Sequence, residues 1–162
     1  MADLDEADRR AIEEAKYRYL RGIDTKDWDL LASTLTEDVE AAWAGGAFEA
    51  SGRDGVVETL RSWMGAESMH TSHRCTHPEL AADGPGAARG IWALSDVVLD
   101  DEQRFLLTGT GYYEDRYVRT ADGWRIAATR YDRGYELVQP WPEGAALTGS
   151  MWRTGGRSTL RP

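Results

Sequence analysis

The chain has 162 residues, of which 41% are hydrophobic and 29% are charged, a balance typical of one globular domain. Its formal net charge of -9 argues against a nucleic-acid or an anionic-membrane partner, because both bind basic surfaces. No apolar run approaches the roughly 18 residues of a membrane span, and the acidic N-terminus does not predict a signal peptide. Cys75 is the single cysteine. We therefore expect a cytoplasmic protein without an internal disulfide.

The first part of the chain predicts three helices, because apolar residues recur there at helical spacing. Gly22 is expected to end the first of them. Between the second and third helices, a strand over residues 39–44 turns at Gly45 and Gly46 and returns from Phe48. The predicted helices cover residues 5–21, residues 28–35 and a segment that begins at residues 52–55.

After Met69 the pattern changes to strands separated by turn signals, of which residues 120–123 are a strong hairpin signal. Helices followed by a long antiparallel meander predict an α+β fold, in which N-terminal helices pack in a curved antiparallel sheet that encloses a cone. We expect one domain over residues 1–140 and a C-terminal tail over residues 141–162. The predicted strands cover residues 71–81, with a break near Pro78, and residues 87–99, 104–119 and 124–138.

Two candidate catalytic residues lie in different halves of the predicted fold. Asp24 follows the first helix, and His73 lies on the first strand after the third helix. A carboxylate beside an imidazole holds one ring tautomer and raises its basicity, as general-base catalysis near neutral pH requires. Considered alone, Asp24 is better explained as a cap of the second helix, and His73 as a surface or core histidine.

The chain has three histidines, and their spacing raises the question of a metal site. On a helix, His70, His73 and His77 would share one face, whereas on a strand His70 points away from the other two. The neighbouring residues favour a strand, so we expect neither a metal site nor a cofactor.

Three segments resemble the SnoaL-like branch of the nuclear transport factor 2-like superfamily. They are residues 22–28 (GIDTKDW), Ser72 with His73, and residues 117–127 (YVRTADGWRIA). The resemblance covers nearly all of residues 5–138 and implies the cone-shaped fold. It does not determine the activity, because the superfamily hosts dehydratases, dehydrohalogenases, isomerases, polyketide cyclases, epoxide hydrolases and binding domains.

The chain is most similar to the group that includes scytalone dehydratase, bile-acid 7α-dehydratase and lindane dehydrochlorinase. This resemblance implies that Asp24 and His73 form the catalytic pair and that Tyr19 belongs to the site. Core packing is an even alternative for Tyr19, which lies on the apolar face of the first helix. The chain departs from scytalone dehydratase at Ile23, where that enzyme has a tyrosine, and at Thr108 or Thr110, where it has a second histidine.

Further candidates would line the cone. Arg130 shares the phase of Trp124 and Ile126 on the last strand, so its guanidinium either pairs with a carboxylate, such as Asp24 or Asp132, or binds the substrate. Alternate residues of the long strand share one face of the sheet, and by analogy with the family this face is expected to line the cavity. These residues are Leu106, Thr108, Thr110 and Tyr112. Helical and strand spacing explains most of the remaining aromatic candidates as core. The substrate-binding candidates are Arg130, Tyr112, Thr108, Thr110, Trp28, Trp43, Trp63, Met64 and Trp92.

These residues predict a cofactor-independent lyase, related to dehydratases, that acts on a small hydrophobic molecule such as a polyketide or steroid. His73 would remove a proton from carbon, Asp24 would orient it, and Tyr19 would hydrogen-bond the substrate. One alternative is an isomerase or polyketide cyclase with the same base. Another is a non-catalytic subunit that binds a hydrophobic ligand or takes part in assembly. The resemblance also implies a homodimer or homotrimer.

Overall fold

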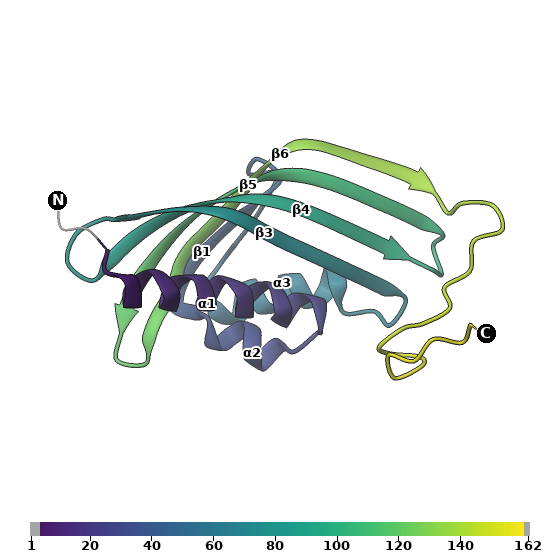
Figure 1. Cartoon of the computed structure of the whole chain (residues 1–162), viewed down its shortest axis with the longest axis horizontal. Helices are drawn as coiled ribbons and strands as arrows, with labels where there is room; N and C mark the ends of the chain where they lie inside the picture. Colours follow the sequence, from purple (N-terminus) through teal and green to yellow (C-terminus); the bar gives the residue numbers. More distant parts are fainter. Residues whose placement is uncertain (1–3, 161–162) are drawn as a thin grey trace.

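The computed structural model describes residues 4–160, which form a curved sheet packed on three helices (Figure 1). The helices are α1 (Glu6–Asp24), α2 (Trp28–Ser33) and α3 (Arg53–Met64). The strands are β1 (Leu35–Trp43), β2 (Phe48–Ser51), β3 (Met69–Ala82), β4 (Ala87–Asp100), β5 (Phe105–Thr120) and β6 (Gly123–Pro140). Each element corresponds to a predicted one with ends shifted by a few residues. The predicted α+β class is therefore confirmed.

The sheet is mixed rather than purely antiparallel. Its strands lie in the order β2-β1-β6-β5-β4-β3, and every neighbouring pair is antiparallel except β1 and β6, which run parallel. The prediction of an antiparallel sheet is wrong at this pair. After β2 the chain passes through α3 to the opposite edge of the sheet, and the meander that starts at β3 returns to β1 only with its last strand.

The long helix α1 runs beneath β3, with α2 and α3 beside it (Figure 1). Asp5 caps its start by accepting a hydrogen bond from the Asp8 N–H at 2.7 Å. Ile12, Tyr19 and Ile23 form its buried stripe. Each fully buried side chain of this size stabilises the fold by about 1.5–3 kcal/mol, so this stripe fixes the helix against the sheet.

Gly22 lies within α1 and does not end it, contrary to the prediction, because the helix continues to Asp24. A Cβ at Gly22 would lie 2.9 Å from the backbone nitrogen of Leu31. The absence of a side chain therefore lets α2 pack closely on α1. This contact brings the chain back sharply after Asp24 and leaves that carboxylate at the edge of the helix layer.

Two β-bulges in β6 change which of its side chains face the helices. Opposite Arg116 and Tyr117, β6 carries one extra residue, Ala127. A second register shift lies opposite Thr110 and Gly111. Each bulge inverts the alternation that follows it. Before the first bulge the inward residues are Trp124 and Ile126, and between the bulges they are Thr129, Tyr131 and Arg133.

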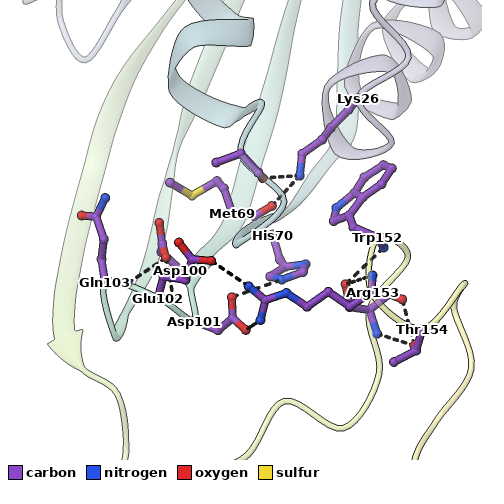
Figure 2. Close-up of polar contacts among 12 residues, drawn as sticks. Lys26, Met69, His70, Asp100, Asp101, Glu102, Gln103, Trp152, Arg153 and Thr154 are labelled. Atoms are coloured by element: carbon purple, nitrogen blue, oxygen red, sulfur yellow. Dashed lines mark hydrogen bonds and ion pairs between the residues drawn. The ribbon is translucent and has the colours of Figure 1, made fainter.

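The segment that follows β6 passes the end of the molecule where β3 begins (Figure 1). Figure 2 shows how its loop is held: Arg153 forms ion pairs with Asp101 and with Glu102, the latter at 3.1 Å. The ammonium of Lys26 lies 4.3 Å from the centre of the Trp152 ring. The same ammonium donates hydrogen bonds of 2.7 Å to the carbonyls of Ala66 and Met69 (Figure 2). Lys26 therefore links the end of α1, the start of β3 and this segment.

A glycine substitution tests the second bulge. A Cβ on Gly111 would overlap the carbonyl oxygen of Asp132 on the neighbouring strand. We expect Gly111→Ala to lower the free energy of unfolding by about 1–3 kcal/mol, because backbone atoms must move. Gly55→Ala is the control, since nothing lies within 4 Å of its Cβ position in α3. It should raise stability by about 0.5–1 kcal/mol in urea denaturation. Equal stability of Gly111→Ala and the unmodified chain would contradict the packing described.

Candidate active site

The Asp24 carboxylate lies at the C-terminal end of α1 and is bound to the edge strand β3. It accepts hydrogen bonds from the Thr71 hydroxyl at 2.8 Å and from the His73 backbone N–H at 2.8 Å. A third hydrogen bond of 2.7 Å joins it to Nδ1 of the His73 ring. Two residues from distant parts of the sequence are thus brought together with a fixed geometry.

Asp24 does not cap α2, so that alternative is wrong. The cap is Asp27, whose carboxylate accepts a hydrogen bond from the Leu30 N–H at 2.9 Å. Between them the chain turns through Lys26, which has a left-handed φ of 53°. The turn uses Asp27 as the cap and leaves the Asp24 side chain free to reach β3.

The hydrogen bonds of Asp24 determine the form of His73. A carboxylate only accepts, so the ring donates to it through Nδ1–H, and in the neutral ring the lone pair then lies on Nε2. The His73 side chain is 9% exposed and the Asp24 side chain 22%. Burial raises the pKa of Asp24, whereas the hydrogen bonds and charge of His73 and the Thr71 hydroxyl lower it, and the resulting pKa is below its ordinary value. Asp24 is therefore a carboxylate near neutral pH, and Nδ1 of the His73 ring is one of its hydrogen-bond donors.

A surface hollow of about 430 Å³ opens onto this pair, between α1 and β3. The rest of its lining comes from one stripe of the helix and one stretch of the strand, and consists of Tyr17, Leu20, Arg21, Arg74, Cys75 and Thr76. A larger hollow of about 640 Å³ lies over β1, β2, β5 and β6. We place the candidate site at the smaller hollow, because it contains Asp24 and His73 and the larger one contains neither residue.

Behind His73 lies an ion pair that sequence reasoning missed. Asp96 stands directly opposite His73 on β4, so both side chains lie on the same face of the sheet. Its carboxylate accepts a hydrogen bond of 2.6 Å from Arg133, which also contacts Glu136 at 3.0 Å. Along β4, Asp96 alternates in the same phase as Trp92 and Leu94, and this pattern predicts that its carboxylate faces the core. Arg133 carried no such signal, because the bulge at Ala127 precedes it and inverts the alternation of β6.

Tyr19 is fully buried beside a buried lysine and is not part of the hollow's lining. The ammonium of Lys16 lies 2.8 Å from Asp115 and 3.4 Å from the centre of the Tyr113 ring. Burial raises the pKa of Tyr19 well above its ordinary value. Lys16 was not among the residues predicted from the sequence to belong to the site. It follows Ile12 by one helical turn and therefore lies on the apolar stripe of α1. The location of Tyr19 corresponds to the core-packing alternative.

Four predicted substrate-binding residues lie on the outer face of the sheet, so their expected orientation is wrong. On β5 the buried residues are Gly109, Gly111, Tyr113, Asp115 and Tyr117, and Tyr112 is 60% exposed. Arg130 is also on the outer face, because the first bulge of β6 inverts its phase, and it pairs with Asp132 at 3.1 Å. The pairing with Asp132 anticipated from the sequence is therefore confirmed. The other two misplaced residues are Thr108 and Thr110.

The remaining predicted lining residues belong to the core or its margin. Trp43 is buried and packs edge-on against Trp63, with ring centres 5.2 Å apart. Trp92 is buried and donates to the hydroxyl of Tyr117 at 3.0 Å. Partly buried positions beside the same cluster are occupied by Trp28, Trp63 and Met64.

The three histidines occupy separate environments. Strand alternation separates His70 from His73, as expected, and the Nε2 atom of His70 lies 3.8 Å from Asp101 (Figure 2). His77 is exposed at an irregular point of β3, where its φ is 52°. Within residues 4–160, no group of three or more histidine, cysteine or acidic side chains is arranged to hold a metal ion.

The structure is a cone-shaped α+β fold in which Asp24 and His73 form a hydrogen-bonded pair at the edge of the sheet. A family profile described as the SnoaL-like domain matches residues 6–130. The chain therefore belongs to the SnoaL-like family. An uncharacterized protein of Mycobacterium tuberculosis is 27% identical over 124 residues, which are 74% of this chain and 81% of that protein.

Solved structures show the same architecture. A candidate scytalone dehydratase from Novosphingobium aromaticivorans superposes with a TM-score of 0.75 at 23% identity, covering 87% of this chain and 96% of that one. The hexachlorocyclohexane dehydrochlorinase LinA-type3 from Novosphingobium barchaimii gives a TM-score of 0.75 at 19% identity, covering 87% and 94%. At these identities the likeness establishes the fold. Among the described helices, none has the length and apolar character needed to cross a membrane.

The lowered pKa of Asp24 makes its contribution to stability dependent on pH. An acid whose pKa is lower in the folded than in the unfolded chain stabilises the fold above the unfolded value, and that contribution is lost as pH falls through the folded value. Asp24→Asn should therefore cost about 1–3 kcal/mol at pH 7 in urea denaturation. The difference from the unmodified chain should shrink below about pH 4. A difference that is constant from pH 7 to pH 3 would contradict an ionised, hydrogen-bonded Asp24.

Proposed function

We propose that the protein is a cofactor-independent lyase in which His73 is the general base and Asp24 is its orienting carboxylate. The observation that supports this proposal is the 2.7 Å contact between Asp24 and Nδ1 of His73, which leaves Nε2 as the basic atom. Asp24 has a lowered pKa and is therefore ionised near neutral pH, where it stabilises the imidazolium that forms during proton transfer.

The proposed reaction is an elimination. Nε2 of His73 takes a proton from a carbon of the substrate, and the electron pair of that C–H bond becomes the new C=C bond. A leaving group on the adjacent carbon departs with its bonding pair, as water after protonation or as an anion. The proton on His73 then passes to solvent or to the leaving group. A positioned base supplies roughly 10²- to 10⁴-fold of rate, so shape and polar groups in the hollow must supply the remainder.

Elimination is favoured over the other reactions of this base by the structural relatives. One is named as a candidate scytalone dehydratase and another as a hexachlorocyclohexane dehydrochlorinase. Loss of water and loss of hydrogen chloride share the abstraction of a proton next to a carbon that bears a leaving group. Isomerisation and cyclisation begin with the same proton transfer, so the product of the reaction distinguishes them.

A deuterium-exchange assay tests the proposed base directly. Cyclic β-hydroxyketones and hexachlorocyclohexane are incubated with the protein in D₂O, and exchange, water loss and chloride release are followed by NMR and ion chromatography. His73→Ala should lower the rate by about 10²- to 10⁴-fold, because the proton acceptor is lost. Asp24→Asn should also lower it, since the neutral amide no longer stabilises the imidazolium.

The matched control is His77→Asn, which removes an exposed histidine of the same strand and places a residue that tolerates a left-handed φ. This variant should retain the full rate. The proposal fails if His73→Ala and His77→Asn turn over an active substrate equally fast. Tight binding of the panel without exchange or elimination would instead support a non-catalytic binding protein.

We also propose that copies of the chain associate through the outer face of the sheet, as a homodimer or homotrimer. Large exposed side chains gather there on neighbouring strands, namely Ile91, Tyr112, Tyr135 and Leu137. Several large exposed apolar side chains on one face of a sheet are typical of a protein interface. Their position opposite the concave side leaves the hollow at His73 accessible.

The association can be tested at Tyr112. Tyr112→Lys should shift the sedimentation coefficient toward that of a monomer, because charge placed in an apolar interface is unfavourable. Met151→Lys, which changes an exposed apolar residue of the C-terminal segment, should sediment like the unmodified protein. A monomeric unmodified chain at micromolar concentration would rule out the interface.

A further inference from the structure

We infer that Lys26 is a positioning residue of the proposed catalytic pair, and that Trp152 of the C-terminal segment holds its ammonium in place. This inference rests on the proposed function, because it concerns how Asp24 and His73 are kept in register. It gives a role in the site to residues 141–160, which lie beyond the part of the chain that the family profile matches.

Lys26 and Asp24 attach the same turn of the chain to the same strand. Asp24 binds β3 at His73, through the backbone N–H and the ring. The Lys26 ammonium donates hydrogen bonds of 2.7 Å to the carbonyl of Met69, the first residue of β3, and to that of Ala66 just before it. A displacement of the start of β3 would therefore move His73 relative to Asp24, and Lys26 opposes that displacement.

The Trp152 ring is the contact of the C-terminal segment with this ammonium. An ammonium has three N–H donors, of which the two carbonyls take two. The Lys26 Nζ atom lies 4.3 Å from the centre of the Trp152 ring (Figure 2). Within residues 4–160, no carboxylate oxygen lies within 4.0 Å of this ammonium. The ring face therefore supplies the attraction that a carboxylate supplies elsewhere.

The surroundings of the ammonium strengthen this contact. Burial lowers the pKa of Lys26, and the charge of Glu67 opposes this effect. The ammonium is thus partly removed from water. A cation over an aromatic ring is held more firmly in such surroundings than at an exposed site.

Trp152 lies in a tight loop that is anchored on its other side. The Thr154 N–H donates to the Ser150 carbonyl at 3.0 Å, and the Ser150 N–H donates to the Thr154 hydroxyl at 3.0 Å. Arg153, the next residue of the loop, forms an ion pair with Asp101 in the turn after β4 (Figure 2). The loop therefore joins the turn after β4 to the turn after α1, and the Trp152 ring has a fixed support.

NMR can detect the contact, because the chain has only two lysines. The ring current of Trp152 should move the ε-CH₂ proton signal of Lys26 upfield. Trp152→Leu should return this signal to its ordinary position, whereas Trp152→Phe keeps an aromatic face and should preserve part of the shift. The signal of the buried Lys16, which lies over the Tyr113 ring, is the internal reference and should stay in place.

The effect on the catalytic pair is measured at His73. Trp152→Leu and Lys26→Gln should each speed hydrogen exchange of the His73 backbone N–H about tenfold, because its acceptor Asp24 is held less firmly. Both variants should also lower the fraction of neutral His73 rings that carry the proton on Nδ1, and Trp152→Phe should largely restore it. With an active substrate, kcat should fall in parallel while KM changes little.

Trp141→Leu is the matched control. Trp141 belongs to the same segment, but its ring lies 4.7 Å from the guanidinium of Arg104 and not over Lys26. This variant should leave the signals of Lys26 and His73 unchanged. The NMR measurements need no substrate, so they test the positioning of His73 separately from the proposed elimination.

Three results would overturn the inference. The first is a Lys26 signal that does not move in Trp152→Leu. The second is a Lys26 signal that moves while the exchange and the tautomer of His73 stay as in the unmodified protein, in which case Lys26 serves only to pack the segment. The third is the same change at His73 in Trp141→Leu as in Trp152→Leu, which would indicate a general loosening of the segment.

Discussion

Three hydrogen bonds hold the Asp24 carboxylate between the end of α1 and the edge strand β3. One of them satisfies a backbone N–H of the edge strand, one uses the Thr71 hydroxyl, and one positions the His73 ring. The same contact therefore supports the fold and sets the tautomer of the neutral His73 ring. Because the carboxylate is fixed by groups other than the ring, His73 is oriented by a rigid partner, which is the arrangement that general-base catalysis favours.

The rest of the architecture keeps this contact in place. Gly22 lets α2 approach α1, and the cap at Asp27 turns the chain away directly after Asp24. Lys26 ties the same turn to the beginning of β3 through two carbonyl groups. On the inner side, the buried pair of Lys16 and Asp115 joins α1 to the centre of the sheet. Loss of one partner from a buried pair of this kind costs about 3–5 kcal/mol, so the helix has little freedom to move away from β3.

Local patterns in the sequence were sufficient for the helices and strands, whereas the pairing of Asp24 with His73 was predicted only from the family resemblance. Helical spacing, turn residues and strand alternation located every helix and strand, and the resemblance linked Asp24 to His73. Side-chain orientation on β5 and β6 was not predictable in the same way. One extra residue at Ala127 inverts the phase of β6, so Arg130 faces outward and Arg133 takes the inward position. The orientation of β5 was assigned by analogy, and its burial pattern shows the opposite phase.

We propose that His73 presents an unprotonated Nε2 to the hollow because Asp24 holds the proton on Nδ1. The most direct measurement is the tautomer of His73 from the ¹⁵N chemical shifts of its two ring nitrogens at a pH where the ring is neutral. We predict a proton on Nδ1 in the unmodified protein, and a loss of this preference in Asp24→Asn. A proton on Nε2 in the unmodified protein would contradict the claim, because no lone pair would then face the substrate.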